Sequence, residues 1–116
     1  MAYIPERGDI IHLQFDPATG HEMQGNHYAL VVSPKAFNAA GLAWVCPISQ
    51  GAASIARTQG FIVTLMGAGL DTQGAVHCHQ LKSLDWKTRK ASKKEAAPGY
   101  ITEEVQARLL AILGES

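Results

Sequence analysis

Long hydrophobic runs and an excess of charge of one sign are both absent from this 116-residue chain. No apolar stretch approaches the ~20 residues that a membrane-spanning helix needs, and the N-terminus carries no apolar signal segment. We therefore expect a soluble, cytoplasmic protein that does not bind membranes. Ten Lys and Arg residues balance ten Asp and Glu residues, which argues against broad electrostatic binding of nucleic-acid duplexes.

Cysteine is scarce, and the rest of the composition is typical of one small globular domain. The two cysteines, Cys46 and Cys78, both lie in apolar, strand-like segments. We interpret them as buried residues in a reducing compartment, since their spacing indicates no disulfide framework. Hydrophobic residues make up 47% of the chain and charged residues 17%. Residues 1–116 are expected to form a single domain, whose small core dimerisation would help to stabilise.

The first three quarters of the chain has the pattern of a β protein. Short apolar or partly alternating segments are separated by turn-rich ones, of which residues 16–26 are too polar for a strand. Alternation in the first apolar segment places Ile11, Leu13 and Phe15 on one face. The predicted strands are Asp9–Phe15, Tyr28–Ser33, Leu42–Ile48, Phe61–Leu65 and Gly74–Leu81.

Two helices are predicted around these strands. Ser33 is expected to cap a single helical turn over Lys35–Asn38. Near the C-terminus the apolar period changes to that of a helix, with Thr102 as its N-cap and Gly114 at its end. The sequence therefore predicts a mainly β fold with α-helices: a small, partly closed barrel with short helices and a packed C-terminal helix.

Short motifs in a shared order and spacing run through nearly the whole chain. They are RGDI at 7–10, FDP at 15–17, GHEMQG at 20–25, ALVVSP at 29–34, AFN at 36–38, PIS at 47–49, GAV at 74–76 and QLKSLD at 80–85. Each motif alone is weak. Together they resemble the MazF/PemK/ChpB family of toxins, and most of all its PemK (Kid) and ChpB branch.

That resemblance implies a fold, partners and a reaction. The implied fold is an SH3-like β-barrel, and the implied partners are a second copy in a homodimer and a cognate antitoxin whose extended tail covers the dimer surface. The implied activity is sequence-specific cleavage of single-stranded mRNA without a cofactor. In that reaction the 2′-hydroxyl attacks the adjacent phosphate and leaves a cyclic phosphate and a 5′-hydroxyl.

The same resemblance implies five catalytic candidates, and three of them are histidines at positions where the family has other charged residues. The family commonly has an Arg where this chain has His27. The PemK branch has an Arg and an Asp around a strand cysteine where this chain has His77 and His79. Ser49 matches the Ser or Thr that follows Pro-Ile in the family, and Glu22 matches an acidic loop residue.

Five further residues are expected to contact the RNA: His21, Gln24, Arg57, Gln80 and Lys82. The first matches a loop histidine of the PemK branch. The last begins a basic segment, residues 82–94, in which six Lys or Arg residues accompany one acid. Such a segment is most often a solvated face, but it is also suited to follow an RNA backbone.

Imidazoles can perform the implied reaction, because a pKa near ~6.5 lets histidine act as a base or an acid at neutral pH. They lack the permanent charge and the two-pronged phosphate grip of Arg. The i, i+2 spacing of His77 and His79 places both on one face of a strand. We expect His27 to join them in one cleft beside residues 19–26. His12 matches no functional position and is interpreted as structural or exposed.

Other interpretations remain open from sequence alone. His77 and His79 also fit two ligands of a metal site with His27 as a third, but no Cys or carboxylate is spaced to complete it, so no metal is expected. Ser49 fits a turn-capping hydroxyl, and Glu22 a solvated loop acid. The alternative functions are a catalytically impaired toxin homologue that still binds RNA or antitoxin, and a CcdB-like toxin that acts on a protein such as gyrase.

Overall fold

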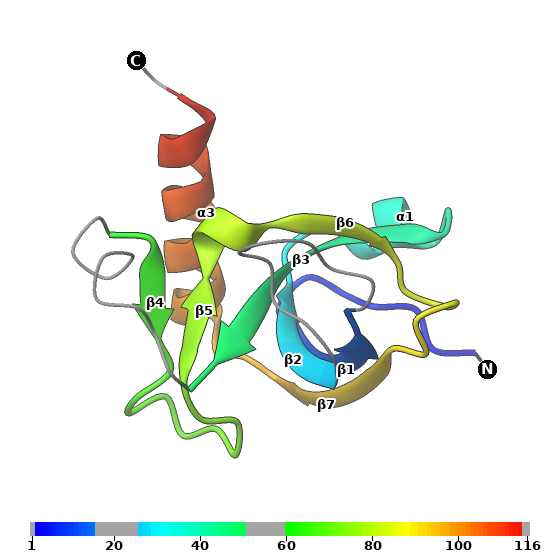
Figure 1. The fold of residues 1–116 in the computed structure, drawn as a ribbon, viewed down its shortest axis with the longest axis horizontal. Coiled ribbons are helices and arrows are strands. Elements are labelled where there is room, and N and C mark those ends of the chain that lie inside the picture. The colour runs from blue at the N-terminus through cyan, green and yellow to red at the C-terminus, as the bar shows by residue number, and fades with distance from the viewer. Residues whose placement is uncertain (1, 16–25, 51–59, 115–116) are drawn as a thin grey trace.

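The computed structural model describes residues 2–15, 26–50 and 60–114, which form a small mainly β fold (Figure 1). Its elements in chain order are β1 (Asp9–Gln14), β2 (Asn26–Val31), α1 (Lys35–Asn38), β3 (Leu42–Ser49), β4 (Ile62–Thr64), β5 (Ala75–His77), the 3-10 turn η1 (Cys78–Gln80), β6 (Lys82–Asp85), β7 (Ser92–Ala96) and α3 (Gly99–Leu113). No helix within these ranges has the length and apolar content to cross a bilayer.

All strand pairs are antiparallel and belong to one sheet. Its order is β4-β5-β3-β2-β1-β7, and β6 pairs with β3 off this path. The long strand β3 has β2 on one edge and both β5 and β6 on the other. In Figure 1 the sheet is coiled, with α3 beside β4 and β5 and with β1, β2, β6 and β7 curling at the other end. The expected mainly β, barrel-like architecture with short helices and a C-terminal helix is confirmed.

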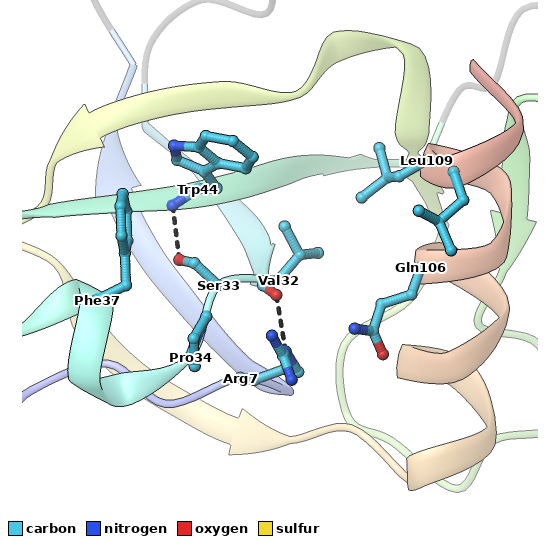
Figure 2. Close-up of a pocket in the computed structure, with 9 residues that line it drawn as sticks. Arg7, Val32, Ser33, Pro34, Phe37, Trp44, Gln106 and Leu109 are labelled. Carbon is cyan, nitrogen blue, oxygen red and sulfur yellow. Dashed lines mark hydrogen bonds between the residues drawn. The ribbon is translucent and has the colours of Figure 1, made fainter. Parts of the chain in front are cut away.

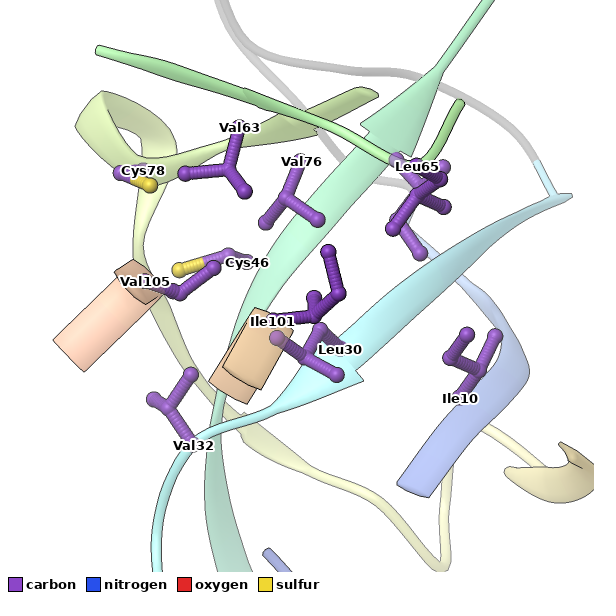
Figure 3. Packing of buried hydrophobic residues seen from close by; sticks show 11 residues of the cluster. Ile10, Leu30, Val32, Cys46, Val63, Leu65, Val76, Cys78, Ile101 and Val105 are labelled. Atoms are coloured by element: carbon purple, nitrogen blue, oxygen red, sulfur yellow. The ribbon is translucent and has the colours of Figure 1, made fainter. Parts of the chain in front are cut away.

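Two hydrophobic clusters stabilise this sheet from its two faces. Figure 3 shows the cluster in which Ile101 and Val105 of α3 pack against the strands. The second cluster includes Ile11, Leu13 and Phe15, so the alternation predicted for β1 is confirmed. Each large side chain that is fully buried in this way stabilises the fold by about 1.5–3 kcal/mol.

The strand prediction is wrong in two places. A single strand over Gly74–Leu81 was expected, but β5 ends at His77 and η1 follows it. No strand was predicted in the basic segment, but it contains β6 and β7, whose side chains are largely solvated in β7 as expected. Because β7 is an edge strand with mostly exposed side chains, its sequence lacks the apolar alternation by which strands are recognised.

The register explains why the strand is interrupted at η1. Ile48 pairs with Val76, and Val45 pairs with Lys82. Along this edge β3 therefore advances by three residues while the opposite chain advances by six. The turn η1 contains the three residues that have no counterpart in β3, and the side chain of His79 within it is exposed.

Both predicted helix N-caps are wrong, although both helices exist and the C-terminal helix ends at Gly114 as predicted. The hydroxyl of Ser33 makes no cap to α1; it donates to the side chain of the buried Asn38. The C-terminal helix α3 begins at Gly99, three residues before Thr102. Thr102 is buried inside the helix, because its position faces the sheet together with the apolar residues that pack there.

Candidate functional site

Two of the predicted catalytic histidines lie side by side where β5 meets η1. The ring centroids of His77 and His79 are 5.5 Å apart. The ring of Phe61 stacks on the other side of this pair, 5.3 Å from His79. The two histidines are thus neighbours as their spacing predicts, although a 3-10 turn rather than a continuous strand brings them together. No feature of the sequence predicts that Phe61 belongs to this site.

The environment of the histidine pair keeps both rings uncharged near neutral pH. Burial lowers the pKa of both His77 and His79, and a charge on His79 would lower that of His77 further. His77 is 5% exposed, and among the described residues neither of its ring nitrogens has a hydrogen-bond partner. A buried polar group without a partner costs about 1–3 kcal/mol, so this ring points to a role other than stability.

The register of the central strands places two further candidates on the same sheet face as His77. Tyr28 pairs with Ile48, and Ser49 pairs with β5. Alternation then sets His27, Ser49 and His77 together on the face opposite Tyr28. From a strand spacing of ~4.8 Å and a rise of ~3.3 Å per residue, the Cα atoms of His27 and His77 are about 12 Å apart. The convergence of all three histidines on one cleft stays a prediction.

His27 and Ser49 also line a cavity of about 510 Å³. The other described residues around it come from β1, β2, β3, β7 and the loop before β5: His12, Tyr28, Ile48, Gln50, Asp71, Thr72, Gln73 and Lys94. Neither residue of the histidine pair belongs to this lining. His12 had been interpreted as structural or exposed, and the cavity gives it a second possible role.

The RNA-binding candidates are described only in part. Gln80 closes η1 and Lys82 opens β6, so both follow directly after the histidine pair. The remaining candidates lie outside the described residues: His21, Glu22, Gln24 and Arg57. Within the described ranges no group of three or more His, Cys, Asp or Glu side chains is placed to hold a metal ion.

A second concave surface lies between α3 and the β3–α1 region and is mostly apolar (Figure 2). This groove has a volume of about 330 Å³. Phe37 and Trp44 meet edge-to-face at 5.8 Å on one side, and Leu109 and Leu110 of α3 stand on the other. Arg7 donates a 2.9 Å hydrogen bond from Nε to a backbone carbonyl at its base. Exposed apolar surface of this kind marks an interaction site in many proteins.

Comparison with known proteins links this fold to one family. The family described as PemK-like, MazF-like toxin of type II toxin-antitoxin system matches residues 6–113. The chain is 43% identical over 109 residues to the endoribonuclease PemK of Escherichia coli, covering 93% of this chain and 81% of PemK. It is 42% identical over 109 residues to the endoribonuclease toxin ChpB of Escherichia coli strain K12, covering 93% of each chain.

Solved structures give the same result for the fold. The crystal structure of MazF from Deinococcus radiodurans matches with a TM-score of 0.87 and 37% identity, over 97% of this chain and 99% of that chain. A structure of MazE-MazF from the same organism matches with a TM-score of 0.82 and 37% identity, over 99% and 100%. The described fold is therefore that of the MazF structures.

Proposed function

This chain belongs to the PemK-like, MazF-like family of toxins of type II toxin–antitoxin systems, and we propose that it is an endoribonuclease that cuts single-stranded mRNA at short sequences. Its similarity to the endoribonucleases PemK and ChpB over 93% of its length supports the activity. The observation that carries the proposal in this chain is the neutral imidazole pair, on a sheet region that also holds Ser49 and His27.

In the proposed reaction the 2′-oxygen of one nucleotide forms a bond to the adjacent phosphorus, and the bond from phosphorus to the 5′-oxygen breaks. His79 is exposed and neutral, so it accepts the proton of the 2′-hydroxyl. His27 gives a proton to the departing 5′-oxygen. The products are a 2′,3′-cyclic phosphate and a 5′-hydroxyl.

The remaining candidates stabilise charge on the phosphate. His77 donates the N–H of its neutral ring to a phosphate oxygen, which requires that the bound RNA displace the groups that cover its buried, unpartnered nitrogens. The Ser49 hydroxyl donates to a second oxygen. The roles of Glu22 and of the RNA contacts His21, Gln24 and Arg57 rest on the family resemblance alone.

Cleavage of a defined single-stranded RNA tests the proposal. We expect cyclic phosphate and 5′-hydroxyl ends, and no cut where the nucleotide at the scissile bond is 2′-deoxy. His77→Ala and His79→Ala should each lower the rate by roughly 100-fold or more. Lys35→Ala, at an exposed position in α1 and outside the basic segment, serves as the control.

Two outcomes would overturn the proposal and select an alternative. RNA or antitoxin binding by the wild-type protein without any cleavage would identify a catalytically impaired homologue. Inhibition of gyrase without loss of RNA would identify a CcdB-like toxin.

The proposed function includes two protein partners. The apolar groove between α3 and β3 is suited to an interface, and we propose that it contributes to a homodimer. The relative from Deinococcus radiodurans has been solved with MazE, which supports a cognate antitoxin for this chain as well. We place the toxin in the cytoplasm, where single-stranded mRNA is available to it.

A further inference from the structure

The cavity beside His27 and Ser49 has one aromatic wall. His12 of β1 and Tyr28 of β2 are directly opposite each other in the register. Their rings meet edge-to-face, with centroids 5.2 Å apart. Tyr28 is also opposite Ile48 of β3, so an apolar side chain adjoins the Tyr28 ring on the side away from His12. Neither ring is fully buried. A flat ligand can therefore stack here, as nucleobases do on aromatic side chains in single-strand binding proteins.

A β-bulge in β7 places the positively charged Lys94 at the cavity. Ile10 pairs with Glu95 and Ile11 pairs with Lys93, so Lys94 is an extra residue without a partner in β1. A bulge of this kind redirects the side chain of the extra residue. Lys94 is exposed and lines the cavity. Its ammonium group is thus available to a phosphate beside a stacked base.

The opposite side of the cavity is held in place by a carboxylate. Glu95 accepts hydrogen bonds from the backbone N–H groups of Asp71 and Thr72, at 3.2 and 2.7 Å, and from the Thr72 hydroxyl at 2.6 Å. The Thr72 bonds, with a smaller contribution from the charge of Lys94, hold the pKa of Glu95 below its usual value. The loop is therefore tied to β7 while Glu95 is ionised. Gln73, which follows Thr72 directly, lines the cavity, and a 3.2 Å hydrogen bond from its Nε2 to the Leu70 carbonyl orients its side-chain amide.

We propose that this cavity is a base-selective subsite for the nucleotide next to the scissile phosphate. The inference rests on the proposed function. The base stacks against Tyr28 and His12, Gln73 reads its hydrogen-bonding edge, and Lys94 contacts a flanking phosphate. The cavity volume of about 510 Å³ suits one nucleotide, since ligand pockets commonly measure ~300–1,000 Å³. His27 and Ser49 line the same cavity, but their side chains alternate to the opposite face of the sheet, so the phosphate of the bound nucleotide reaches them around the ends of β2 and β3.

A randomised single-stranded RNA library, cut by the purified protein and sequenced at its new 5′ ends, tests the subsite. Tyr28→Leu should weaken the base preference at one position beside the cut by roughly 10-fold, because stacking on the ring is lost. Tyr28→Phe keeps the ring and should keep the preference. Lys94→Ala should raise KM severalfold with an unchanged preference, whereas Lys35→Ala, at an exposed position outside the basic segment, should leave both as they are.

The outcomes separate this inference from the proposed function. Cleavage by Tyr28→Leu with wild-type preference and wild-type KM would overturn the subsite while the endoribonuclease stands. If the wild-type protein cuts no RNA, the proposed function fails, and binding of 2′-deoxy-substituted oligonucleotides by fluorescence polarisation decides the subsite. Equal affinities of wild type, Tyr28→Leu and Lys94→Ala for every sequence would then overturn it too. Because Lys94 is exposed, its variant gives a result even if Tyr28→Leu fails to fold.

Discussion

Burial of His77 couples the candidate site to the stability of the fold. The ring is almost fully buried, and its pKa is lowered from 6.5 because the charged form is poorly solvated. In the unfolded chain the same ring is exposed and takes up a proton near pH ~6.5. The folded state therefore binds fewer protons than the unfolded state just below that pH. Its stability must fall as the pH drops.

We predict that the free energy of unfolding decreases below about pH 6.5 and that His77→Gln flattens this decrease. Glutamine has no charge to gain, so the variant loses the proton uptake that favours the unfolded state. Urea titrations at a series of pH values from about 8 to about 5 measure the slope. The exposed His79→Gln is the matched control and should change the slope less. Equal slopes in wild type and His77→Gln would contradict the prediction.

The pH dependence of cleavage follows from the same desolvation. Sequence reasoning predicts a bell-shaped rate profile centred near pH ~6–7 for a pair of imidazoles. Because burial lowers the pKa of His79, the base stays neutral to lower pH. We predict that the acid limb of the profile lies below pH 6.5, the ordinary value for histidine. Single-turnover rates measured across this range provide the test. A rate that is flat across the range would show that no histidine is the catalyst.

At the scale of elements, the connection between β4 and β5 holds β3 and β5 in close contact. Gly74 has a φ of +114°, a backbone angle that residues with a side chain rarely adopt. A Cβ at this position would lie 2.5 Å from the carbonyl oxygen of Ser49. Glycine is therefore required where the chain passes beside this candidate catalytic residue.

We predict that Gly74→Ala destabilises the protein by about 2 kcal/mol or more, because both the backbone conformation and the close approach oppose a methyl group. Chemical denaturation measures the loss. Gly99→Ala is the control: it lies in the first turn of α3, and a Cβ there meets nothing within 4 Å. That control should be neutral or slightly stabilising. A wild-type midpoint for Gly74→Ala would contradict the prediction.

The elements that sequence reasoning identified are those with a local signal. The apolar runs of β2 and β3 and the helical period of α3 are visible in any short window. The strands β6 and β7 are not, because their pairing partners lie far away in the chain and the lysines of β7 face solvent. The bounds of β5 depend on the register against β3, which no local pattern contains.

The candidate site likewise contains some features that the sequence predicts and others that it does not. The neighbourhood of His77 and His79 was predictable from their spacing, and their roles came from the family resemblance. The contacts of Phe61 and Lys94 were not predictable, since a ring stack and a bulge arise only when distant strands pair. His12 was placed correctly in β1, but its role as a cavity wall needs Tyr28 opposite it.

At the scale of the whole molecule, the groove between α3 and β3 leaves large apolar side chains exposed. Trp44 is 43% exposed and Leu110 is 65% exposed. In a chain of this size such a surface is costly to leave in water and is suited to association. The groove adjoins the internal core, since Val32 and Leu109 contribute to both.

We predict that Leu110→Glu shifts the proposed homodimer toward monomer, because it introduces a charge into the apolar groove. Light scattering at micromolar concentrations measures the mass. Met66→Glu places the same charge at an apolar position that is 84% exposed and outside the groove, and it should not change the mass. A wild-type protein that is purely monomeric would contradict the dimer, and an unaffected Leu110→Glu dimer would place the interface elsewhere.

The three surplus residues at η1 give the molecule an adjustable segment inside an otherwise fixed sheet. The pairings of β5 and β6 with β3 anchor it at both ends, and the buried Cys78 fixes its first residue in the core. An exchange at the exposed His79 can therefore alter the chemistry of the site while the sheet pairings on either side stay in place. Of the three candidate histidines only His79 has this freedom, because His27 and His77 lie in paired strands where a change also meets the packing of the sheet.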